Sequence, residues 1–130
     1  MMNLSVNEDI SKLGLSERVD EKLKRLQEEK HFADMRDAYR VGIALAIAYG
    51  ICPPEIMPPK VNRYNISQID EDKSIETTIN LLIDTEGVPT YRWAERLAEW
   101  GVEKLSQESE KGQIDFSKLI LEAKEKSKNI

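Results

Sequence analysis

Histidine and cysteine are nearly absent from this 130-residue chain, which contains one of each, His31 and Cys52. A single cysteine cannot form an internal disulfide, and these two residues cannot supply a zinc site built from cysteine and histidine. A cysteine or serine nucleophile would depend on the same histidine as its base, and nothing in the sequence orients that pair. The sequence therefore predicts no metal, no cofactor and no catalytic residues of these classes.

Long apolar runs and glycine-rich loops are missing as well. No stretch reaches the roughly 20 apolar residues that cross a bilayer, and residues 1–9 lack the apolar core of a signal peptide. The six glycines are scattered, and none precedes Lys-Ser or Lys-Thr as in a phosphate-binding loop. We expect a soluble, cytoplasmic protein with no membrane partner.

An excess of basic charge is also lacking, because 19 Lys and Arg stand against 24 Asp and Glu, giving a net charge of −5. Non-specific binding to nucleic-acid phosphates is therefore weak by default. Hydrophobic residues make up 40% of the chain, which is enough for one domain with its own core. We expect residues 1–130 to form a single domain, with 1–10 and 124–130 frayed at its ends.

Helical periodicity and capping residues predict about five helices and an all-α fold, an orthogonal helical bundle. Ser16, Asp34 and Asp115 can accept orphan backbone N–H groups at helix starts. The expected helices cover 16–30, 35–49, about 74–86, 90–110 and 115–123. Three glycines are placed to end helices: Gly50, Gly87 and Gly112. The last helix is expected to bury Phe116, Leu119, Ile120 and Ala123.

The second helix is apolar on every face from Val41 to Ala48, which predicts a central helix surrounded by the core. Gly42 and the alanines beside it would let neighbouring helices approach closely. Gly101 lies inside the fourth helix, where glycine costs about 1 kcal/mol relative to alanine, so we expect close packing to offset that cost.

Residues 52–60 hold four of the five prolines and predict an extended internal connector. A short β-ribbon is expected near 11–15 or 61–69, although the alternation of polar and apolar residues is poor in 61–69.

Aromatic residues are few, and three of them lie close together in the fourth helix. Trp93 and Trp100 are seven residues apart and therefore share one side of that helix, near Tyr91. Trp and Tyr are enriched in interface hot spots, so these residues form a candidate partner-binding patch. The alternative is that they belong to the core. Both interpretations hold if the helix packs against another copy of the chain.

The order of the first elements resembles a ribbon–helix–helix unit, in which two chains pair their strands and place strand side chains in the major groove of DNA. Such a unit would comprise 11–15, 16–30 and 34–49. Lys12 would read bases, and Arg18, Lys22 and Arg25 would contact phosphates. Residues 1–40 carry 8 basic and 9 acidic side chains, whereas a DNA-binding domain usually has a basic footprint.

Carboxylates are plentiful, and the densest group is Asp70-Glu71-Asp72. This run lacks the Gly and Glu of a calcium loop, and a helix N-terminus favoured by the helix dipole explains it more simply. Glu28 and His31 have the Glu-x-x-His spacing of di-iron bundles, but such a site needs a second pair. An enzyme that uses carboxylates alone is the least favoured hypothesis.

Two stretches together resemble the small proteins associated with bacterial DNA phosphorothioation (Dnd-type) systems. The first is F-A-D-M-R-D-A-Y-R-V-G-I-A-L-A-I-A-Y-G, from Phe32 to Gly50. The second, within 79–105, contains W-A-E-R-L-A-E-W-G-V-E-K-L. It closes on Gly101, Val102 and Leu105. The chain departs from the pattern after Gly50, where prolines replace the expected basic residues. The resemblance implies an accessory component near DNA modification or anti-phage defence, with no catalytic residues.

The sequence thus favours a non-enzymatic helical interaction protein, an accessory subunit of a bacterial assembly that binds a protein partner or itself. A dimeric ribbon–helix–helix-like DNA-binding regulator is the alternative.

Overall fold

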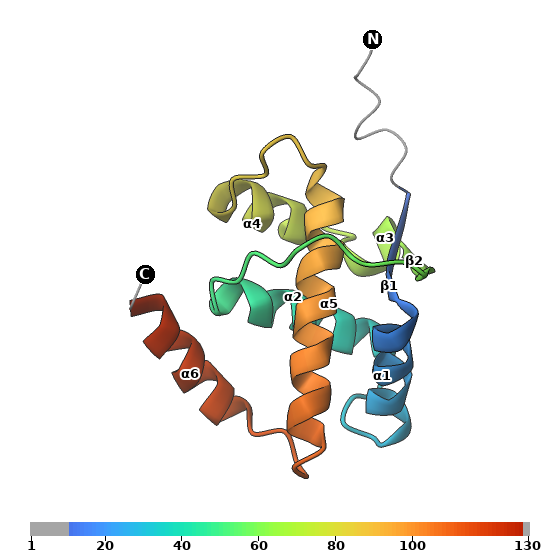
Figure 1. Ribbon diagram of the computed structural model, residues 1–130, viewed down its shortest axis with the longest axis vertical. Coiled ribbons are helices and arrows are strands. Elements are labelled where there is room, and N and C mark those ends of the chain that lie inside the picture. Colours follow the sequence, from blue (N-terminus) through green and yellow to red (C-terminus); the bar gives the residue numbers. More distant parts are fainter. Residues whose placement is uncertain (1–10, 129–130) are drawn as a thin grey trace.

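The computed structural model describes residues 11–128 and is mainly helical with a short β-ribbon, as the sequence predicts (Figure 1). These residues form six helices and one two-stranded sheet, one helix more than expected. The additional helix, α3, has four residues and lies in the segment where a strand was an open possibility. The elements are β1 (Lys12–Ser16), α1 (Glu17–Glu28), α2 (Met35–Ala48), β2 (Lys60–Asn65), α3 (Ile66–Ile69), α4 (Ser74–Leu82), α5 (Thr90–Ser109) and α6 (Phe116–Lys128).

The two segments that suggested a ribbon pair with each other. β1 and β2 are antiparallel, with Leu13 opposite Tyr64 and a register shift between Leu13 and Gly14. A Cβ atom on Gly14 would lie 2.0 Å from the carbonyl oxygen of Val61, so this irregular position requires glycine. The ribbon is closed within the chain and joins the first helical unit to the segment that follows the connector.

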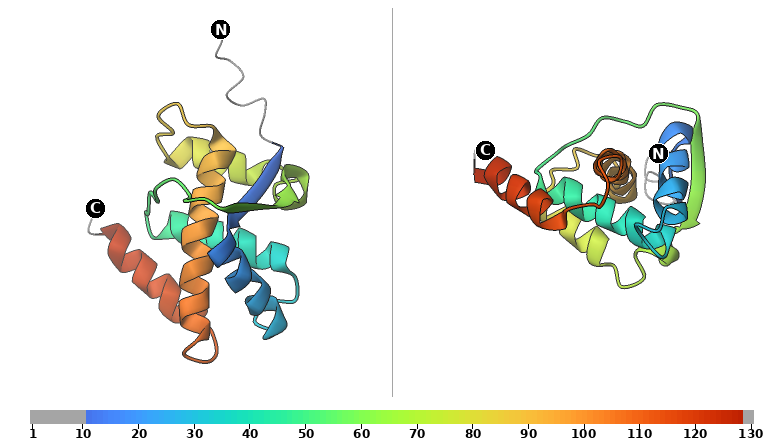
Figure 2. Two further views of the ribbon diagram at one scale, coloured as in Figure 1. Left: turned by 45° about the vertical axis from the view of Figure 1, so that its right-hand side comes forward. Right: turned by 90° about the horizontal axis from the view of Figure 1, so that it is seen from below.

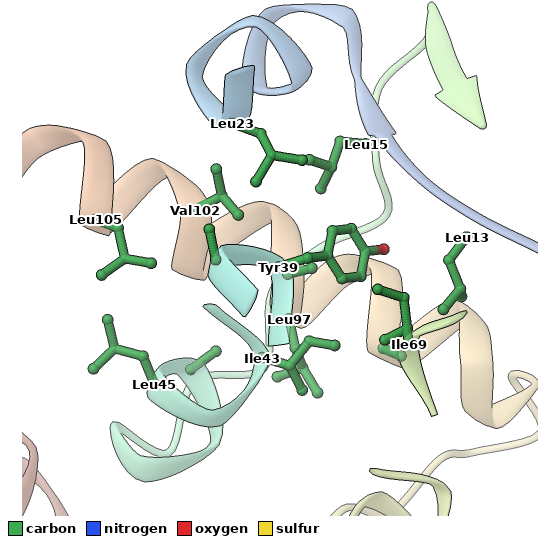
Figure 3. Close-up of a cluster of buried hydrophobic side chains, with 14 of the residues drawn as sticks. Leu13, Leu15, Leu23, Tyr39, Ile43, Leu45, Ile69, Leu97, Val102 and Leu105 are labelled. Atoms are coloured by element: carbon green, nitrogen blue, oxygen red, sulfur yellow. The ribbon is translucent and has the colours of Figure 1, made fainter. Parts of the chain in front are cut away.

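The core lies where α2 crosses α5, and β1 and α1 cover it (Figure 3). Tyr39 and Ile43 of α2 meet Leu97 of α5, and Leu13 and Leu15 of β1 point into the same cluster. All five side chains are almost completely buried. Burial of such side chains contributes about 1.5–3 kcal/mol each, which makes this crossing the main source of stability.

Capping residues set the starts of three helices as predicted. The Ser16 hydroxyl accepts the Val19 N–H, and the Asp34 carboxylate accepts the Arg36 N–H at 2.8 Å. At the start of α6, the Asp115 carboxylate accepts the N–H of Lys118 at 3.1 Å. The proline-rich connector 52–59 has no helix or strand, and it crosses in front of α5 to reach β2 (Figure 1).

Helix ends and outer faces differ from the expectations. α4 ends at Leu82 and α5 at Ser109, so Gly87 and Gly112 lie in the turns beyond, where both have positive φ. α6 remains helical through residues 124–128, where fraying was expected, whereas residues 1–10 lie outside the described part of the chain. Leu119 and Ala123 are buried as predicted. The predicted burial of two α6 residues is wrong, because α6 contacts the rest of the protein along only one narrow side: Phe116 and Ile120 are 41% and 55% exposed.

The prediction that α2 is surrounded by the core is also wrong on one side. Ala44 and Ala48 are exposed, although the residues on the opposite face of α2 are buried. Figures 1 and 2 show α4 and α6 on either side of the C-terminal half of α2. Neither helix covers the strip of α2 that carries Ala44 and Ala48. Within residues 11–128, no helix is both long and apolar enough to cross a membrane.

Candidate protein-binding site

The three aromatic residues of the predicted partner-binding patch do not form one surface. Tyr91 is buried and its hydroxyl donates to Asp70 Oδ2 at 2.8 Å. Trp93 is buried and its indole N–H donates to the Thr85 carbonyl at 3.0 Å. Trp100 is half-buried, with its ring centroid 5.3 Å from that of Tyr49. Tyr91 and Trp93 therefore pack as core residues, and a role in partner binding stays a prediction, with the exposed edge of Trp100 as its accessible part.

The residues of the DNA-binding alternative lie on β1 and α1, and two of them are already paired. Arg18 and Lys22 both form ion pairs with Glu103 of α5, at 2.5 and 2.9 Å. Lys12 and Arg25 are exposed. DNA contact by these four residues stays a prediction.

The strand that would pair between two DNA-binding subunits is bonded on both edges within this chain. One edge of β1 pairs with β2. On the other edge, the Gly14 N–H donates to Glu95 at 2.9 Å and the Ser16 N–H donates to Glu99 at 3.0 Å. Inter-chain pairing of β1 would have to displace these carboxylates.

Among the described residues four carboxylates are buried, and each has a structural partner. Asp70 accepts the backbone N–H groups of Ile75 and Glu76, at 2.8 and 3.0 Å, and so holds the start of α4. The others pair with cations: Asp20 with Arg63, Glu95 with Lys60 and Arg92, and Glu108 with Lys111 and Lys118. Buried charges need such partners. The burial of each of these acids is thus accounted for by a structural partner.

No group of three or more His, Cys, Asp or Glu residues is arranged to hold a metal within the described residues. His31 lies in the turn after α1, with Nε2 3.7 Å from the Glu29 carboxylate. Cys52 is exposed in the connector. The structure does not place these two residues in a common catalytic arrangement.

A groove of about 680 Å³ lies between α2 and α4. Its floor is the side of α2 that carries the exposed Ala44 and Ala48 and the half-buried Ile47, with the buried Ile43 at its base. Its wall is the side of α4 that carries Ile75 and Thr78, with Ile69 at one end. We call this feature the α2/α4 groove. Leu82 follows Ile75 and Thr78 at i+7 and i+4, and therefore extends the same side of α4.

Local sequence explains why α4 leaves the groove open. α4 has nine residues, and Ile79 is the one buried among them. Its packing is mainly against α5, and Asp70 anchors its first turn. A helix attached by one buried side chain and its cap does not close over α2. Its last two residues remain exposed, Leu81 at 77% and Leu82 at 66%.

The end of the groove near α3 carries negative charge. Glu71 and Asp72 line it and are exposed. The Asp72 carboxylate accepts the Ser74 N–H at 3.0 Å, and this hydrogen bond lowers the pKa of Asp72 below its usual value. Arg40 also lines the groove, but its guanidinium donates to the carbonyl oxygens of Gln68 and Ile69. Asp72 is therefore ionised at neutral pH.

The sequence analysis missed this groove. The run Leu81-Leu82-Ile83 was a usable signal, because three consecutive apolar residues span about 200° of a helix, which is more than one buried side covers.

Comparison of the sequence with protein-family models, curated proteins and solved structures gives no match.

Proposed function

We propose that this chain is a non-enzymatic interaction protein and that the α2/α4 groove binds a protein partner. The observation that carries the proposal is the uncovered apolar side of α2 and α4, which is lined by Ala44, Ile47, Ala48 and Ile75. Exposed apolar surface that is continuous and bordered by polar groups is characteristic of protein–protein contact sites. The buried acids already have structural partners, which favours binding over chemistry.

The shape and lining of the groove favour a helix as the bound element. Ala44 and Ala48 are four residues apart on α2 and are both exposed, so their short side chains permit close approach of a second backbone. Helix-in-groove recognition uses apolar anchors at i, i+3 or i+4 and i+7, which match the periodic wall of α4. The resemblance to Dnd-type proteins favours an accessory subunit of a bacterial assembly in DNA modification or anti-phage defence.

Site-specific photo-crosslinking tests the proposed function. Benzoylphenylalanine is placed at Ala44, in the groove, and in a matched protein at Gln107, an exposed residue of α5. Both proteins are irradiated in an extract of the source organism. We expect a discrete protein adduct from position 44 and none from position 107. Identical adducts from both positions, or none from a folded protein at position 44, would contradict the proposed function.

A further inference from the structure

Helix α6 has an exposed apolar side, which is the kind of surface that an apolar groove binds. Its apolar attachment to the molecule is through Leu119 and Ala123, which are 0% and 5% exposed. On its outer side Ile120 is 55% and Leu121 is 63% exposed. We propose that α6 of a second copy of this chain occupies the α2/α4 groove. This inference rests on the proposed function and names the partner.

The dimensions of the two elements agree. From Arg40 to Ala48 the floor of the groove spans about 12 Å at 1.5 Å per helical residue. α6 has 13 residues, or about 20 Å, so it can cover the whole floor. The alanine floor receives Ile120 and Leu121, while Leu82 closes over them from the wall.

Charge sets the direction of the inserted helix. Beyond Leu121, the outer side of α6 carries Lys124, which is followed by the exposed Glu125. The acidic end of the groove carries Glu71 and Asp72. Lys124 meets these acids when α6 runs antiparallel to α2, and the apolar residues of α6 then lie at the end of the groove near Ala48. Antiparallel helices also place opposite ends of their dipoles together.

In a twofold arrangement, the groove of each copy is filled by α6 of the other. α4 and α6 both lie beside the C-terminal half of α2 (Figure 1). Two copies related by a twofold axis exchange α6 helices reciprocally, because residue i of one copy meets residue j of the other and j meets i. The contact closes on itself as a dimer.

Sedimentation velocity over about 1–500 μM protein tests the proposal. We expect the wild-type chain to reach twice the mass of one chain as concentration rises. Leu82→Asp and Leu121→Asp should each weaken association at least about tenfold, because each places a charge in the apolar contact. Leu81→Asp is the matched control, since Leu81 is also an exposed leucine, at 77%, and lies on another side of α4. Circular dichroism and melting temperature show whether each variant folds.

Mixing two variants distinguishes α6-in-groove exchange from any other dimer. Ala44→Glu blocks the groove and leaves α6 intact, whereas Leu121→Asp alters α6 and leaves the groove intact. We expect each variant alone to be monomeric and their mixture to form a heterodimer through the one contact that remains. The proposed pairing would be overturned if the two variants stay monomeric after mixing. It would also be overturned if Leu81→Asp abolishes the dimer and Leu82→Asp leaves it intact.

A double mutant tests the proposed pairing of Lys124 with Glu71. Glu71→Lys and Lys124→Glu should each weaken the dimer about two- to fivefold, as for an exposed ion pair, and the double variant should recover the wild-type affinity. A wild-type chain that stays monomeric at every concentration would overturn self-association. The proposed function would then still stand if position 44 crosslinks to a different protein, and would fail if it crosslinks to none.

Discussion

At the scale of single residues, the closest packing in the molecule depends on two glycines. A Cβ atom on Gly101 of α5 would lie 1.9 Å from the carbonyl oxygen of Gly42 in α2. That separation is far below van der Waals contact, and the obstacle is backbone, which cannot rotate away. The sequence analysis predicted close packing at Gly101 from the cost of a glycine inside a helix, and this prediction is confirmed.

Gly101→Ala should therefore destabilise the protein by about 2 kcal/mol, since an overpacking cost of about 3 kcal/mol at the crossing exceeds the roughly 1 kcal/mol that alanine gains in a helix. Gly42→Ala is the comparison, because its Cβ would lie 3.0 Å from the Val102 nitrogen and needs only a small shift. Urea unfolding of both variants measures the difference. Equal stability of Gly101→Ala and the wild type would contradict the described α2–α5 contact.

At the scale of elements, α6 is attached by a small apolar contact and by polar links. Lys118 of α6 donates to Glu108 of α5 at 3.3 Å, and the Tyr49 hydroxyl of α2 donates to Glu122 of α6 at 2.7 Å. Desolvation raises the pKa of Glu108, but hydrogen bonds from Lys111 and Lys118 outweigh it and bring that pKa below its ordinary value of 4.5. The ionised form of Glu108 therefore stabilises the folded protein.

Glu108→Gln should lower the free energy of unfolding by about 1 kcal/mol at pH 7, as loss of a charged hydrogen-bond acceptor does. A carboxyl with a depressed folded-state pKa contributes stability above pH 4.5, and loses it as the pH falls through the folded-state value. The difference in unfolding free energy between wild type and variant, measured by chemical unfolding, should therefore decrease below pH 4.5. Glu110→Gln, at an exposed neighbour, is the control. A gap that is unchanged at pH 3, or an equal effect of Glu110→Gln, would contradict this role of Glu108.

The sequence predicted the starts of elements better than their ends. Ser16, Asp34 and Asp115 cap their helices through bonds that reach only two or three residues along the chain, so local sequence suffices. The end of α4 and the exposure of Ile120 depend on what packs nearby, which local periodicity does not contain. α4 ends before Gly87 because the segment that follows turns away to begin α5.

At the scale of the whole molecule, long-range contacts decide what the local patterns leave open. β1, α1 and α2 follow the order of a ribbon–helix–helix unit, yet β1 pairs with β2, which lies beyond the connector. The groove could not be predicted from the sequence either, because local periodicity does not distinguish Ala44 and Ala48 from Ala38 and Ala46. Ala38 and Ala46 are fully buried, and the other two are exposed. The difference arises from how far α4 and α6 cover α2.

The central claim is that the binding face consists of the α2/α4 groove and the outer side of α6. A dilution series of amide and methyl NMR spectra tests it most directly, because each residue reports its own environment. The account predicts concentration-dependent shifts at Ala44, Ala48, Leu82 and Leu121, and constant shifts at Lys12 on β1. Shifts concentrated on β1 and α1, or none anywhere up to millimolar protein, would contradict it.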